Sequence, residues 1–195
     1  MEHGDRSRLS IRALTLLMCP LTLTACIHLQ RYPQSWESIA RKDRHTECAD
    51  VTGIYDNSGE TTSGSQVPLA VWLDPTINHW NTPARTRVER ELTSAQQVQL
   101  DVSRSQLQIT AIGTGTRRQW SYRYACRRGK VHLARFGDLG GDNVALVGSD
   151  VLDLYRVKDH LVVNRHGVFA GVALLIPVAG YERTWTRFPV RPNPQ

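Results

Sequence analysis

Cysteine offers the most reactive side chain in this sequence, and one of its four cysteines stands where covalent modification is expected. Cys26 closes the run Leu23-Thr24-Ala25-Cys26, which ends an apolar stretch that begins at Ala13. Three basic residues precede that stretch: Arg6, Arg8 and Arg12. A basic start, a short apolar middle and small residues before a cut are the layout of a secretory signal peptide. The sequence therefore predicts that residues 1–25 are removed on export.

The run that ends at Cys26 resembles a bacterial lipobox. In lipoproteins the cut falls just before the cysteine, and the thiol carries a diacylglyceryl group. The resemblance therefore implies a mature chain that begins at acylated Cys26 and is held at a lipid bilayer. Two or three acyl chains would make detachment negligible, because each buried methylene contributes about 0.8 kcal/mol. Ile27 rather than Asp follows the cysteine, which in Gram-negative lipoproteins implies the outer membrane, facing the periplasm.

Two other interpretations of this segment stay open. One is an ordinary secretory signal that has a cysteine near the cut by chance. The other is a signal anchor that stays in the membrane. A spanning helix needs roughly 18 or more apolar residues. The stretch from Ala13 to Ala25 is shorter and is interrupted by Pro20, so the sequence favours the lipidated form.

Size and charge suit one exported domain. The chain has 195 residues and carries 24 Lys+Arg against 18 Asp+Glu, a formal net charge of +6. This balance indicates a solvated surface with weak attraction to anionic partners such as phospholipid head groups. No nucleic-acid recognition motif occurs in the sequence, so we expect no nucleic-acid partner. The predicted organisation is a signal peptide over 1–25, a lipidated N-terminus and tether over 26–47, one β domain over 48–190 and a flexible tail over 191–195.

Cys48 and Cys126 remain once Cys19 leaves with the signal and Cys26 is acylated. In an oxidising compartment an even pair favours one disulfide. Such a bridge would pin the start of the domain to the middle of the sheet. On the chain-entropy model it would stabilise the fold by about 4–5 kcal/mol. Two buried free thiols are the alternative.

Alternation of apolar and polar residues with period two dominates from Val98 onward. Short strands about ten residues apart, separated by turn residues, predict an antiparallel meander and hence a single β-sandwich or small barrel. One or two short helices are expected, after Pro68 and around Val88 and Leu92. The expected strands lie near residues 51–55, 98–102, 107–111, 120–126, 131–133, 144–147, 151–157, 161–165, 168–177 and 184–188. The apolar run Val172 to Val178 is too short to span a bilayer and is predicted to be a strand buried on both faces.

The segment from Cys48 to Glu60, CADVTGIYDNSGE, resembles the opening of a group of uncharacterised proteobacterial lipoproteins. Those chains share a lipobox and a Cys-x-Asp-x-Ser/Thr-Gly-x-Tyr start. They also have a later Tyr-x-Cys strand, here Tyr124 to Cys126, and a late apolar strand that ends in proline, here Leu174 to Pro177. The resemblance implies a lipid-anchored envelope protein and brings no known activity. Gly53-x-Tyr55 is also similar to the Gly-x-Trp of lipocalins, which implies a closed barrel as one form of the fold.

Trp120, Tyr122 and Tyr124 share one side of a predicted strand. Such a stripe fits the core of the sheet, and the sharper alternative is a ligand-facing wall, because aromatic side chains line small-molecule sites. The motifs Gly-x-Ser-x-Gly and His-x-x-x-His and a glycine-rich phosphate loop are absent from the sequence. We therefore expect no catalytic residue, no metal site and no cofactor.

These patterns favour a non-enzymatic, membrane-anchored protein of the cell envelope. Its β domain would bind or scaffold an envelope protein or a small ligand. The alternatives are a small-molecule or lipid carrier and, after it, an envelope hydrolase. A carrier needs a barrel with an apolar cavity of roughly 300 Å³ or more. A hydrolase needs a convergent set of nucleophile, base and acid.

Overall fold

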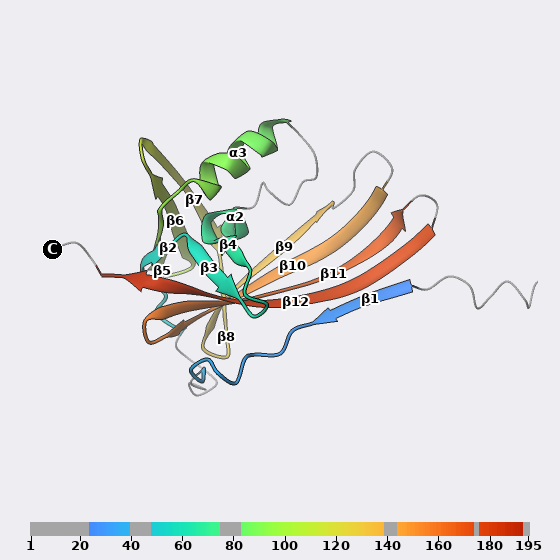
Figure 1. Cartoon of the computed structure of the whole chain (residues 1–195), viewed down its shortest axis with the longest axis horizontal. Coiled ribbons are helices and arrows are strands. Elements are labelled where there is room, and N and C mark those ends of the chain that lie inside the picture. Colours follow the sequence, from blue (N-terminus) through green and yellow to red (C-terminus); the bar gives the residue numbers. More distant parts are fainter. Residues whose placement is uncertain (1–23, 40–47, 75–82, 139–143, 174–175, 193–195) are drawn as a thin grey trace, which may run out of the picture.

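The computed structural model describes residues 24–39, 48–74, 83–138, 144–173 and 176–192. Twelve strands form the sheet, and two described helices lie on one side of it (Figure 1). The sheet is not closed, and its ladders are antiparallel except where β1 (Thr24–Leu29) pairs with β12 (Ile176–Arg191). The prediction of a single, mainly β domain with one or two short helices is confirmed, and a closed lipocalin-like barrel is not formed by the described strands.

The remaining elements follow the chain from the first turn to the last hairpin. They are β2 (Gly53–Asp56), β3 (Ser58–Thr61), β4 (Gln66–Pro68), α2 (Leu69–Leu73), α3 (Pro83–Thr93), β5 (Gln97–Ser103), β6 (Gln106–Gly113), β7 (Thr116–Arg123), β8 (Ala125–Arg127), β9 (Lys130–Asp138), β10 (Val144–Val157) and β11 (His160–Ala173). The hydrogen-bonded order across the sheet is β7-β6-β5-β2-β12-β11-β10-β9-β8, with β1, β3 and β4 branching from it.

Strand β12 organises the sheet, because both of its edges are paired along most of its length. On one edge β11 pairs with it from Ile176 to Pro189. On the other edge three strands follow one another: β1 at residues 178–183, β3 at 186–187 and β2 at 190–191. The two halves of the sheet, and the N-terminal strand, are therefore joined through this one strand.

The main core lies between the sheet and helices α2 and α3. Successive side chains of a strand point to opposite faces. Leu100 on one half of the sheet and Leu152 and Leu161 on the other half face the helices and have no exposed surface. Helix α2 adds Leu69 and Leu73, which are also fully buried. Below, this face is the helix side and the opposite face is the open side.

A single buried amide joins the two helices to the sheet. Asn57, between β2 and β3, donates from Nδ2 to the carbonyl oxygens of Leu92 (2.8 Å) and Ala95 (2.9 Å). Its Oδ1 accepts a hydrogen bond from the backbone N–H of Ala70 at 2.8 Å. The end of α3 and the start of α2 would otherwise leave unpaired backbone groups in the core. One side chain therefore satisfies two helix termini.

Three of the predicted strand boundaries are wrong. The expected strands at 144–147 and 151–157 are one strand, β10, and residues 161–165 are only the first part of β11. The expected strand at 168–177 is two strands, because Ala173 pairs with Ile176 and the chain reverses between them. No glycine, asparagine or aspartate marks this reversal, so the usual turn signal was missing.

The prediction that Val172–Val178 are buried on both faces is also wrong. Val172 is 43% exposed and Ile176 is 54% exposed. Both residues lie at the far end of the β11–β12 hairpin, which extends beyond the two described helices (Figure 1). Their apolar character therefore needs an explanation other than the core.

Gly59 on β3 permits the close packing of β3 on β12. A Cβ at this position would overlap the ring of buried Phe188 and lie 2.8 Å from the Arg187 carbonyl oxygen. We expect Gly59→Ala to lower the free energy of unfolding by about 1–3 kcal/mol, because overpacking forces backbone shifts. Urea denaturation measures this, with the exposed neighbour Ser58→Ala expected to stay within about 0.5 kcal/mol of wild type. Equal effects of the two variants would contradict the packing argument.

Candidate functional site

The expected lipidation residue lies on the outer strand of the sheet. Cys26 belongs to β1 and stands opposite Gly180 of β12 in the parallel ladder. The pairing continues to Leu29 opposite Arg183, and the N–H of Gln30 then donates to the Arg183 carbonyl oxygen at 3.1 Å. The residue that would carry the acyl chains is therefore fixed in register to the domain.

The segment that follows β1 packs on the open side of the sheet. Tyr32 and Trp36 pack with Ile39 against a small cluster that includes Trp185. The ring of Tyr32 meets Trp185 edge to face with centroids 5.0 Å apart, and the guanidinium of Arg187 lies 5.0 Å from the centre of the Trp36 ring. Residues 24–39, which the sequence predicted as part of a tether, are thus attached to the sheet, and residues 40–47 lie outside the described residues.

The aromatic stripe packs against the main core. Trp120, Tyr122 and Tyr124 are all partly buried there. Trp120 donates from Nε1 to the Leu73 carbonyl oxygen at 3.0 Å, and the Tyr124 hydroxyl donates to the Arg104 carbonyl oxygen at 3.1 Å. The core role expected for the stripe agrees with these contacts, while a ligand-facing role stays a prediction.

The Tyr122 hydroxyl is buried without a hydrogen-bond partner among the described residues, and so is Nε of Arg135. Burial raises the pKa of Tyr122, and the nearby Arg135 charge offsets this only in part. The tyrosine therefore stays neutral at physiological pH.

The predicted disulfide between Cys48 and Cys126 is present. Its Cα atoms are 5.3 Å apart, and its cysteines are separated by 78 positions in the sequence. The Ala49 N–H also donates to the Gly129 carbonyl oxygen at 2.9 Å, so the chain entering β2 is held beside the β8–β9 turn. The bridge joins the beginning of the domain to the far end of the strand order.

We expect the double variant Cys48→Ser/Cys126→Ser to unfold with a free energy lower by about 4 kcal/mol, because the open loop regains entropy when unfolded. Chemical denaturation measures the loss. The matched control is wild type after reduction, which should lose a similar amount, whereas reduction should leave the double variant unchanged. Labelling of either cysteine by a thiol reagent in the unreduced native protein would contradict the bridge.

Two buried carboxylates stand three residues apart on β10 and so face opposite sides of the sheet. Asp153, 1% exposed, lies on the open side. Its Oδ1 is 2.7 Å from Nδ1 of His132, its Oδ2 is 3.4 Å from Nε2 of His166, and it forms an ion pair with Lys130. Burial opposes its ionisation, but hydrogen bonds from His166, Lys130 and His132 outweigh burial and hold the pKa of Asp153 well below its usual range.

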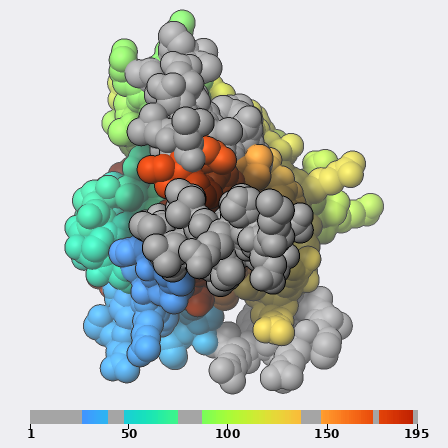
Figure 2. All heavy atoms as spheres, turned by 90° about the vertical axis from the view of Figure 1, so that its right-hand side faces the viewer, coloured from blue at the N-terminus to red at the C-terminus, as the bar shows by residue number. Residues whose placement is uncertain are grey.

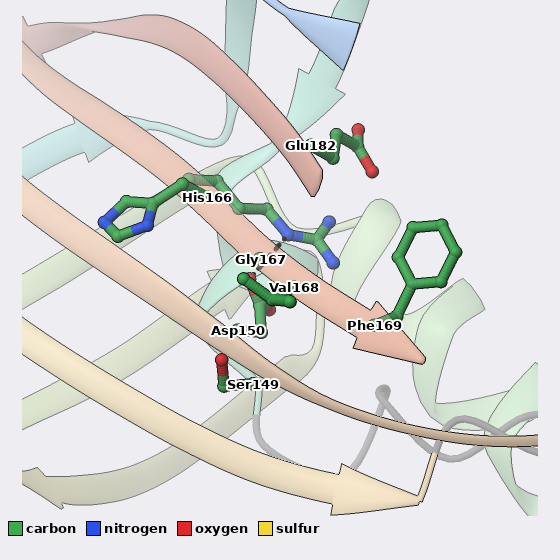
Figure 3. A pocket seen from close by; sticks show the side chains of 8 residues that line it. Ser149, Asp150, His166, Gly167, Val168, Phe169 and Glu182 are labelled. Atoms are coloured by element: carbon green, nitrogen blue, oxygen red, sulfur yellow. Dashed lines mark hydrogen bonds and ion pairs between the residues drawn. The ribbon is translucent and has the colours of Figure 1, made fainter. Parts of the chain in front are cut away.

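Asp150 carries the second cluster, on the helix side. Arg135 binds one of its oxygens at 2.5 Å and Arg165 binds the other at 3.1 Å. Figure 3 shows this pair beside Phe169 and Glu182, around a hollow of about 80 Å³. Ligand pockets usually measure 300 Å³ or more, so this hollow suits an ion or a few water molecules better than an organic ligand.

These clusters are suited to structure rather than to proton transfer. Both carboxylates are satisfied by cationic partners, so neither is free to act as a general base. No group of three or more histidine, cysteine or acidic side chains among the described residues is arranged to hold a metal ion. The largest hollow described, about 440 Å³, is lined mainly by polar side chains, including Glu37, Arg156 and Lys158.

The sequence analysis missed both clusters, although a signal was present. Asp153 stands between Leu152 and Leu154 in an otherwise apolar strand. An acidic residue in such a run is on the open side of the sheet or is paired, and the chain does not say which partner it has. The partners come from β9 and β11, which only the register of the sheet brings together.

Comparison with protein-family models, with curated proteins and with solved structures finds no match to this chain. None of the described helices is both long and apolar enough to cross a membrane. No family is therefore assigned, and the site must be interpreted from its own geometry.

We expect Asp153→Asn to lower the free energy of unfolding by about 3 kcal/mol at pH 7, because the buried cations lose their counter-charge. The lowered folded pKa means that Asp153 contributes stability above its unfolded pKa of about 3.9 and loses it as the pH falls through the folded value. The gap between wild type and variant should therefore narrow below about pH 4. Thermal or urea unfolding across pH measures it. The exposed Asp159→Asn is the control, and a gap independent of pH would contradict this account.

Proposed function

We propose that this chain is a lipoprotein of the cell envelope, anchored through acylated Cys26. Its β domain binds or scaffolds another component of the envelope, and the organisation of the signal favours the outer membrane, facing the periplasm. The observation that carries the proposal is the run Leu23 to Cys26 at the end of a basic and apolar leader. Its resemblance to a lipobox implies that the thiol is the acylated group.

Two structural features support this proposal. The disulfide between Cys48 and Cys126 suits an oxidising compartment outside the cytosol. The pairing of Cys26 with Gly180 would leave little slack between the acyl chains and the sheet. A domain held in this way presents a fixed surface to its surroundings, which fits binding or scaffolding better than free diffusion.

A carrier function has less support from the geometry. The sheet is not closed, and the hollows lined by described residues are small or mainly polar. A transported lipid would need a continuous apolar cavity of roughly 300 Å³ or more. Scaffolding is therefore the better account of this domain.

Radiolabelled palmitate tests the anchor directly. We expect wild type to incorporate the label and to sediment with membranes after a carbonate wash, whereas Cys26→Ser should lose both properties. Two acyl chains bind a bilayer almost irreversibly, so the soluble fraction should change from nearly none to a large share of the protein.

Cys19→Ser is the matched control, because Cys19 lies upstream of the cut and should leave labelling and sedimentation unchanged. Mass spectrometry of the purified protein should find the acyl mass on the N-terminal residue. An unmodified thiol at position 26 in the native protein would contradict the proposal.

A further inference from the structure

Six exposed apolar side chains gather on one part of the open side. Their exposed fractions run from 43% for Val172 to 85% for Phe136. Together they form what we call the apolar patch: Ile27, Leu29, Phe136, Val147, Val168 and Val172. They come from β1, β9, β10 and β11, at the end of the sheet that Figure 2 faces. Soluble monomers rarely expose contiguous apolar surface of this kind unless it is a contact surface.

The register shows that the patch is continuous across the sheet. Ile27 lies opposite Tyr181, Tyr181 lies opposite Val168, and Val168 lies opposite Ser149. Ser149 in turn lies opposite Phe136. Residues paired across strands point to the same face. One row of side chains therefore crosses five strands, from β1 to β9, and is mainly apolar.

The hairpin that underlies the patch carries no charge over its outer part. From Gly167 to Tyr181 the sequence contains no acidic, basic or histidine residue. Charge begins where Glu182 pairs with Gly167 and Arg183 pairs with His166. The uncharged part holds six residue pairs and is roughly 20 Å long at about 3.3 Å per residue. A boundary between apolar and charged surface thus crosses the sheet at this row.

The position of Cys26 identifies the occupant. Cys26 immediately precedes Ile27 on β1 and stands opposite Gly180, inside the uncharged part of the sheet. Acyl chains on Cys26 would bring a bilayer to within a few residues of every member of the patch. We infer that the apolar patch rests on the lipid bilayer as a second, non-covalent contact, an inference that depends on the proposed acylation only for the identity of that membrane.

Backbone pairing decides how deep the contact is. β8 pairs with β9 only at residues 130–132, so the described outer edge of β9 from Leu133 onward has no strand beside it. Unpaired backbone groups do not enter the hydrocarbon region, because nothing there satisfies them. The sheet therefore lies in the interface with its side chains in the outer part of one leaflet, and does not span the membrane.

A thiol placed in the patch tests this contact in the complete, acylated protein. With Cys26 acylated and Cys48 bonded to Cys126, a cysteine at Val168 is the only free thiol of the mature chain. The protein is reconstituted in phosphatidylcholine vesicles, which carry no net charge. We expect a membrane-impermeant maleimide to react with Val168→Cys about tenfold more slowly than with the same protein unfolded in denaturant, because interfacial side chains lie below the head groups.

Gln119→Cys on β7 is the matched control, since Gln119 is exposed and lies outside the patch. Its thiol should react at nearly the rate of the unfolded chain. Vesicle flotation in the same samples reports the anchor separately. Protein that floats but reacts equally fast at both positions overturns the inference while leaving the proposed acylation intact.

The unacylated chain supplies an arm that does not depend on lipidation. In a Cys26→Ser background, the reaction of Val168→Cys should slow as phosphatidylcholine vesicles are added, while that of Gln119→Cys should not. A response at neither position overturns the inference, whatever palmitate labelling of wild type reveals.

Dilution separates the bilayer from a second copy of the chain as the occupant. At fewer than one protein per vesicle, slow reaction at Val168→Cys should persist if the bilayer covers the patch. Slow reaction that disappears on dilution would mean that another copy covers it, and would overturn the inference.

Discussion

The pairing of both edges of β12 is the constraint on which the rest of the structure depends. One edge meets β11, and the other meets β1, β3 and β2 in succession. Each partner fixes a different part of the molecule: the long hairpins, the N-terminus, and the half of the sheet that carries β5, β6 and β7. Gly59 allows β3 to approach, and Phe188 fills the space that results. A disturbance of β12 would therefore affect every layer together.

Buried charge is distributed along β10 with the same economy. Asp150 pairs with arginines on the helix side, and Asp153 pairs with Lys130 and two histidines on the open side. Neither cluster has the spare hydrogen-bonding capacity that catalysis requires. Each instead ties β10 to its neighbours through side chains as well as backbone. Ion pairs of this kind contribute little net stability when they form, but their partners are costly to remove.

The sequence predicted the period-two strands, the two helices and the disulfide, because those features depend on local alternation or on the compartment. Pro68 and the spacing of Val88 and Leu92 were sufficient to place α2 and α3. The turn between Ala173 and Ile176 was missed, because its residues are apolar and resemble a continuing strand. The cluster around Asp153 was missed because its partners come from different strands. Cys26 is a clear local signal, whereas its place opposite Gly180 depends on the whole fold.

The ladder between β1 and β12 also dictates when the molecule is complete. The first described strand finds its partner in the last one, so almost the entire polypeptide must be present before they meet. Contacts between such distant segments form late, because the entropy of a long loop must be lost first. A chain translocated with its N-terminus in front would carry β1 unpaired until β12 emerges. Assembly of this sheet is therefore necessarily a post-translocational event, and an escort that shields the waiting edge would accelerate productive folding.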